Sequence, residues 1–140
     1  MMDIALGAHL TSPRKGFVHH GIYLGGRRVI HYGGYERSLR RSPVEIVTLD
    51  EFTRGRGLGI VDSVAPRYAG NTCVERACSR LGEDRYRLLS NNCEHFTEWC
   101  ISGASRSRQV EAYVETVRSL FDRLVRPVMR KPRSSRLRAR

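Results

Sequence analysis

The sequence lacks the features that mark zinc-bound, secreted and membrane-spanning proteins. Its 140 residues include four cysteines, and none of them forms a C-x-x-C pair, so the common zinc spacings are absent. It has no run of about eighteen apolar residues, which a membrane-spanning helix requires, and its N-terminus lacks the basic and apolar regions of a signal peptide. We therefore expect a cytoplasmic chain with free thiols and no membrane-spanning helix.

Acidic residues are scarce, above all at the C-terminus. The formal net charge is +11, and residues 126–140 contain seven basic side chains and no acidic one. The basic residues there are Arg126, Arg130, Lys131, Arg133, Arg136, Arg138 and Arg140. Because Pro127 and Pro132 disfavour a helix, we expect a disordered basic tail, for which anionic lipid or nucleic acid is the natural counter-surface. Nucleic acid suits this tail less well, because no aromatic residue interleaves with the arginines to stack on bases.

The first half of the chain has the pattern of a β-sheet. Residues 17–24 and 27–32 are rich in strand formers and surround Gly25–Gly26, a dipeptide typical of a hairpin turn because glycine adopts positive φ without strain. Residues 44–49 predict a third strand, and residues 59–64 a weaker fourth.

The second half predicts three helices. Apolar residues recur at helical spacing over 74–81, before Gly82. A second helix is expected to begin after Asn92, whose side chain can cap it, and to end at Gly103. The third, over 110–125, carries an apolar stripe that we expect to pack in the core. A small antiparallel sheet followed by packed helices is an α+β fold.

Cys93 is the strongest candidate for a nucleophile. At the start of a helix its sulfur lies near unpaired N–H groups and the positive end of the helix dipole, which favours the thiolate and lowers the thiol pKa. His19 and His31 flank the predicted hairpin turn, so they lie on neighbouring strands. We expect the sheet to offer both imidazoles to Cys93 as a nucleophile, base and orienting group.

Other interpretations of these residues are weaker. A lone cysteine is by default an inert small hydrophobe, which is how we interpret Cys73, Cys78 and Cys100. A zinc site built from cysteine and histidine is disfavoured, because no local pair has the spacing of ligands on one helix face. Alternation along the first strand places His19, Gly21 and Tyr23 on one face and His20, Ile22 and Leu24 on the other.

Three segments resemble the lecithin:retinol acyltransferase family. They are His19-His20-Gly21-Ile22-Tyr23-Leu24-Gly25, Val29-Ile30-His31 and Asn92-Cys93-Glu94-His95-Phe96. Their order matches the family pattern H-x-[AG]-I-Y-[LV]-G, a second histidine downstream, and N-C-E-H-F. The similarity extends over about residues 9–115.

The resemblance implies a circularly permuted, papain-like fold of the NlpC type, with a catalytic domain over residues 1–125. It implies that Cys93 is the nucleophile, His19 the base and His31 the orienting histidine, with no metal or organic cofactor. His20 is then a packing or surface residue, and His95 makes a structural hydrogen bond. The expected activity is acyl transfer or phospholipase A-type hydrolysis on phospholipid or another lipid ester.

Two other functions stay open. A cysteine amidase or peptidase would use the same groups on the same fold. A module without catalysis would bind anionic partners through its basic tail. The sequence also departs from relatives that carry a C-terminal membrane-spanning helix. An alternative peripheral contact is the basic tail with the amphipathic stripe of Val117, Leu120, Phe121, Leu124, Val125 and Val128.

Overall fold

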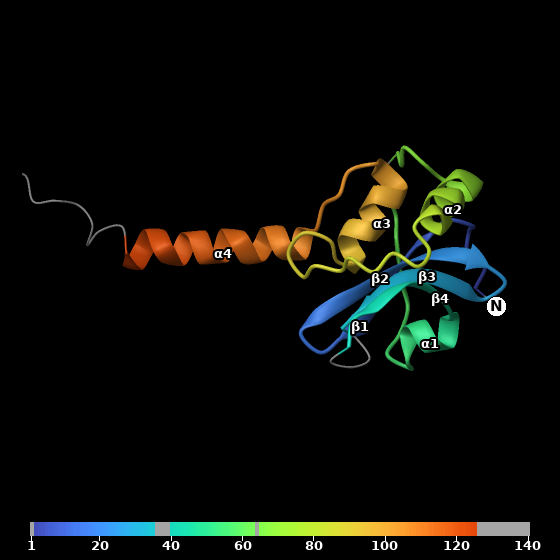
Figure 1. The fold of residues 1–140 in the computed structure, drawn as a ribbon, viewed down its shortest axis with the longest axis horizontal. Coiled ribbons are helices and arrows are strands. Elements are labelled where there is room, and N and C mark those ends of the chain that lie inside the picture. The colour runs from blue at the N-terminus through green and yellow to red at the C-terminus, as the bar shows by residue number, and fades with distance from the viewer. Residues whose placement is uncertain (1, 36–39, 64, 126–140) are drawn as a thin grey trace, which may run out of the picture. The chain divides into compact units, whose positions relative to one another are not determined.

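The computed structural model describes residues 2–35, 40–63 and 65–125. It divides into two compact units, Met1–Arg108 and Gln109–Arg140. The first unit contains the sheet and three helices, and the second contains most of the last helix (Figure 1). The predicted basic tail, residues 126–140, lies outside the described residues, and its boundary with a catalytic domain at 125 stays a prediction.

The first unit is built on one antiparallel sheet. Its strands are β1 (His9–Arg14), β2 (Phe17–Gly25), β3 (Arg28–Gly34), β4 (Ser42–Thr48) and β5 (Gly59–Val61), in the order β4-β3-β2-β1-β5. All pairs are antiparallel, and β2 is the central strand. The α+β class is confirmed.

The predicted hairpin is present between β2 and β3. Ile22 pairs with Ile30, and Gly25 and Gly26 both have positive φ, as the turn requires. The predicted third strand is β4, and the weaker fourth is the short β5.

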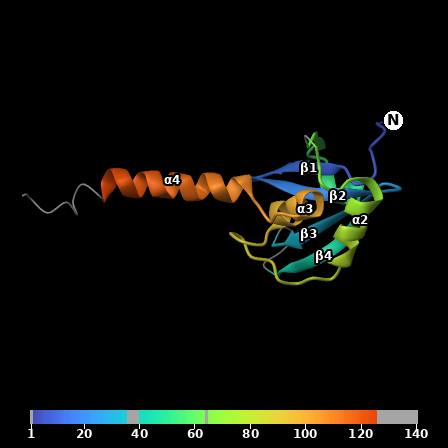
Figure 2. The same ribbon diagram turned by 90° about the horizontal axis from the view of Figure 1, so that it is seen from above.

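Helices cover both faces of the sheet. The short α1 (Leu49–Thr53) lies on one face, whereas α2 (Gly70–Ser79) and α3 (Cys93–Ser102) lie on the other (Figures 1 and 2). Two apolar clusters correspond to these faces. The α1 face buries Leu10, Val29, Val47 and Phe52. The α2–α3 face buries a larger set that consists of Ile22, Leu24, Ile30, Tyr32, Val44, Cys73, Ala77, Cys93, Phe96, Cys100 and Ile101.

The start of α3 is fixed by a reciprocal cap. The Asn92 side-chain oxygen accepts hydrogen bonds from the backbone N–H groups of Glu94 and His95, and His95 Nδ1 accepts one from the Asn92 N–H. Gly103, in the left-handed conformation at φ 79°, ends the helix. Both predicted ends of this helix are confirmed, and so is the structural hydrogen bond of His95.

The last helix, α4 (Arg108–Leu124), differs from the prediction. None of its residues is buried, and Tyr113 is 61% and Leu124 70% exposed. Within its own unit the apolar stripe of 110–125 is thus not buried, in contrast to the expectation that it packs in a core. Within the described part of the chain, no helix combines the length and the apolar character needed to cross a bilayer.

Candidate active site

Cys93 occupies the first position of α3. Its side chain is 3% exposed and packs in the apolar cluster between α3 and the sheet. The Asn92 cap takes the next two N–H groups, so the first turn is held rigidly around the thiol. A sulfur at this position experiences the positive end of the helix dipole.

His19 and His31 are joined in a buried chain that ends on a carboxylate. His19 Nε2 lies 2.5 Å from His31 Nδ1, and His31 Nε2 lies 3.2 Å from Glu45 Oε1. Because a carboxylate accepts hydrogen bonds, His31 Nε2 carries the proton given to Glu45, and His31 Nδ1 then accepts from His19 Nε2. This arrangement leaves His19 Nδ1 as the basic nitrogen.

The His19 imidazole is held in its neutral form. Burial lowers its pKa well below the ordinary value, and the neighbouring His31 and Arg14 lower it further. A neutral imidazole is the form that accepts a proton, so this site keeps the base ready at neutral pH.

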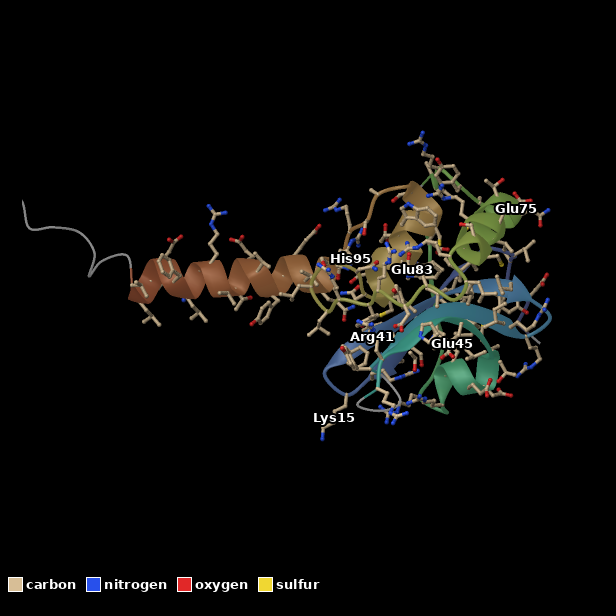
Figure 3. The ribbon with its side chains drawn as sticks, viewed as in Figure 1. Lys15, Arg41, Glu45, Glu75, Glu83 and His95 are labelled. Atoms are coloured by element: carbon tan, nitrogen blue, oxygen red, sulfur yellow. The ribbon has the colours of Figure 1, made fainter. Side chains whose placement is uncertain are left out.

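The two predicted parts of the site lie on different faces of the sheet. The His19 and His31 rings contact Phe52 of α1, with centroid distances of 5.2 and 6.1 Å. Cys93 packs with α3 on the opposite face, beside Ile22. Figure 3 shows His95 on the α3 side and Glu45 on the α1 side. That the sheet offers both imidazoles to Cys93 as base and orienting group stays a prediction.

A second imidazole pair lies on the face that Cys93 shares. His9 Nε2 is 2.7 Å from His20 Nδ1, and both rings are buried. Burial lowers both pKa values, that of His9 to about 4, while the nearby Glu94 carboxylate opposes this change. The prediction treated His20 as packing or surface, and the structure shows it buried and hydrogen-bonded. The alternation along β2 already separated His20 from His19, but β1, which carries His9, was not predicted.

Glu94, which is near the His9–His20 pair, also contacts the segment that follows α3. The Ser107 hydroxyl donates to Glu94 Oε2 at 2.7 Å, and both side chains are buried. A buried carboxylate requires such partners. Sequence reasoning missed both residues, although Glu94 lies inside the N-C-E-H-F segment.

The other cysteines are free thiols with different surroundings. Burial raises the pKa of Cys73 to about 11 and raises that of Cys100 further, which suits inert packing residues, whereas Cys78 is exposed. Among the residues that the structure describes, no three histidine, cysteine or acidic side chains are grouped to hold a metal ion.

Comparison with known proteins identifies the family. A family model described as lecithin retinol acyltransferase matches residues 2–106. The chain is 29% identical to lecithin retinol acyltransferase of Rattus norvegicus over 142 residues, which cover 82% of this chain and 62% of that protein. Identity to the Homo sapiens protein of this name is 28%, with the same coverage.

A second kind of relative is similar over more of its own length. Phospholipase A and acyltransferase 2 of Homo sapiens is 28% identical over 128 residues, which cover 80% of this chain and 79% of that protein. The chain thus spans less than two thirds of the lecithin retinol acyltransferases it matches. Because the family model covers most of the chain, including the β2–β3 histidines and the start of α3, the chain belongs to the lecithin retinol acyltransferase family.

Proposed function

We propose that this chain is a thiol-dependent acyltransferase or lipid hydrolase in which Cys93 carries the acyl group as a thioester. The observation that carries the proposal is the position of Cys93, the first residue of a capped helix inside the N-C-E-H-F segment. The relatives named for acyl transfer and for phospholipase A activity support a lipid ester as substrate. The permuted, NlpC-type arrangement of the papain-like fold is part of this proposal.

The proposed reaction has two steps. His19 Nδ1 takes the Cys93 thiol proton, and the sulfur attacks the ester carbonyl of a phospholipid or another lipid ester. The tetrahedral oxyanion collapses, the carbon–oxygen bond breaks, and His19 returns the proton to the leaving alcohol. An alcohol, amine or water then gives a proton to His19 and attacks the thioester, which releases the Cys93 thiol. The Cys93 backbone N–H is our proposed donor to the oxyanion.

His31 and Glu45 support this role of His19. When His19 gains a proton, its positive charge is shared through His31 with the Glu45 carboxylate, which stabilises the imidazolium. His31 acts as the orienting group, because it fixes the tautomer and the ring position of His19.

Direct transfer also requires Cys93 and His19 to meet. The His19 ring contacts Phe52 of α1, whereas Cys93 packs in the cluster of α2 and α3, so the identity of the imidazole that takes the thiol proton is part of this proposal. His20 already lies on the α3 face, and it is the alternative proton acceptor. A comparison of His19→Ala with His20→Ala therefore belongs in every test of the mechanism.

The direct test is mass spectrometry of the purified chain after incubation with a phospholipid. We expect a mass increase of one acyl chain on Cys93, and no increase in Cys93→Ala. A Cys93→Ala variant with full turnover would show that the thioester mechanism is wrong. An acyl-enzyme formed from a peptide substrate, and not from lipid, would instead identify an amidase.

We further propose that residues 126–140 contact anionic membranes. Their seven basic side chains have no acidic neighbour within the segment, so the attraction to anionic lipid is not offset locally. Vesicle binding that falls steeply with added salt is the expected result, and binding that is insensitive to salt would contradict it.

A further inference from the structure

The segment before Cys93 forms a turn that is held firmly in place. Its backbone is fixed by several hydrogen bonds, among them those from the Arg85 N–H to the Tyr32 hydroxyl, from the Arg87 N–H to the Asn91 carbonyl, and from the Asn91 side chain to the Arg85 carbonyl. We call residues 85–91 the Arg85–Asn91 turn. The Leu88 and Leu89 side chains at its tip take no part in this hydrogen bonding.

The tip of this turn is apolar and exposed. Leu88 is 67% and Leu89 56% exposed, and neither contributes to the apolar clusters described above. Two adjacent leucines in water at the end of a rigid turn lose the stabilisation that burial would give them. They are flanked by the exposed arginines Arg85 and Arg87. An apolar tip with a basic flank has the character of a membrane-interface contact.

A basic hollow lies beside the tip. It has a volume of about 500 Å³ and is lined by Arg41, Asp84, Arg85, Arg87 and Asn91. Arg41 Nε lies 2.8 Å from Asp84 Oδ1, so that pair is close to neutral. In the described part of the chain, no carboxylate forms an ion pair with Arg85 or Arg87. The hollow therefore presents two guanidinium groups, which suit the oxygens of a phosphate.

We propose that the Arg85–Asn91 turn docks on a bilayer of anionic phospholipid, with Leu88 and Leu89 in the acyl region and a headgroup phosphate between Arg85 and Arg87. The site rests on the proposed function, because it places a phospholipid near the thiol. Asn91 lies two residues before Cys93, a span of about 7 Å at most. The turn would thus bring the donor ester to the start of α3.

The test is vesicle cosedimentation of the full chain in the Cys93→Ala background, so that no acyl transfer occurs. The vesicles contain equal amounts of phosphatidylcholine and phosphatidylglycerol, and the salt concentration is high enough to weaken binding by the tail. We expect Arg85→Gln/Arg87→Gln to lower vesicle binding about tenfold or more. Leu88→Ser/Leu89→Ser should lower it about tenfold.

Matched controls separate the site from general charge and hydrophobicity. Arg28→Gln/Arg56→Gln removes the same charge from exposed positions elsewhere, and Leu81→Ser removes a leucine that is 53% exposed. Each control should change binding less than about twofold, within the range for surface substitutions. Equal losses in the two arginine pairs would overturn the proposal, and so would unchanged binding in both turn variants. All of these residues are exposed, and thermal unfolding checks that each variant is folded.

Two further outcomes identify the ligand and separate this proposal from the catalytic one. If inorganic phosphate binds through Arg85 and Arg87 while Arg85→Gln/Arg87→Gln leaves vesicle binding unchanged, the site recognises free phosphate and the bilayer proposal is wrong. If the vesicle results hold while no acyl-Cys93 forms in the wild-type chain, the docking site stands and the thioester mechanism fails.

Discussion

Two adjacent histidines of the central strand β2, His19 and His20, each pair with a histidine of a neighbouring strand, on opposite faces of the sheet. His19 pairs with His31 on the α1 face, and His20 pairs with His9 on the α3 face. The first pair continues to Glu45, so a proton gained at His19 is balanced by a carboxylate. In the second pair, His9 Nδ1 is buried and has no hydrogen-bond partner among the residues that the structure describes. The α1-face pair is therefore better suited to accept a proton, whereas the α3-face pair lies on the same face of the sheet as Cys93.

Among the variants of this site, removal of the Cys93 thiol has the largest expected effect on turnover. Cys93→Ala should lower turnover by about four orders of magnitude or more, because no other group can form the thioester. Turnover of a short-chain phospholipid measures this. Cys78→Ala, which removes an exposed thiol from α2, is the matched control and should keep full activity.

The two neighbouring histidines provide the sharpest contrast. We expect His19→Ala to lower kcat about a thousandfold, because the base with a carboxylate behind it is lost. His20→Ala should lower kcat about tenfold or less at a temperature where both variants are folded. Turnover of the two variants at equal folded fraction is the measurement. A larger loss of kcat in His20→Ala than in His19→Ala would identify His20, on the α3 face, as the proton acceptor.

Substitution of Glu45, the carboxylate that His31 contacts, should have a smaller effect on kcat than substitution of His19. Glu45→Gln and His31→Ala should each lower kcat by about tenfold to a hundredfold, the range for residues that orient another group. Glu45→Gln should also shift the acidic limb of the pH–rate profile to lower pH, because the imidazolium loses its stabilising partner. An unchanged profile would leave Glu45 with a structural role alone.

The His9–His20 pair should affect mainly the free energy of unfolding and its dependence on pH. Because the pKa of His9 is about 4 in the folded chain and its ordinary value is 6.5, the unfolded chain binds more protons between these values. Stability should therefore be full above pH 6.5 and fall as the pH drops towards 4, with about 3 kcal/mol from His9. Chemical denaturation across this range measures it. A His9→Phe variant should flatten the dependence, and an equally steep curve in that variant would contradict the assignment.

Most of the local structure could be predicted from short sequence patterns. The Gly25–Gly26 turn and the Asn92 cap are set by residues within a few positions, so both were predicted correctly. The strand β1 was not predicted, because Ser12 and Pro13 interrupt its apolar pattern, and its pairing with β2 is a long-range property. The short α1 was also missed, although Thr48 and Glu51 form the capping box that begins it.

The candidate site shows the same division between local and distant information. Alternation along residues 17–25 was sufficient to place His19 and His20 on opposite faces, because side-chain direction in a strand is a local property. It could not show which face α3 would cover. Both faces carry apolar residues, such as Val29 on one and Ile30 on the other, so either could pack against a helix. The choice depends on how distant segments bury their apolar surfaces together, and only the folded chain contains that information.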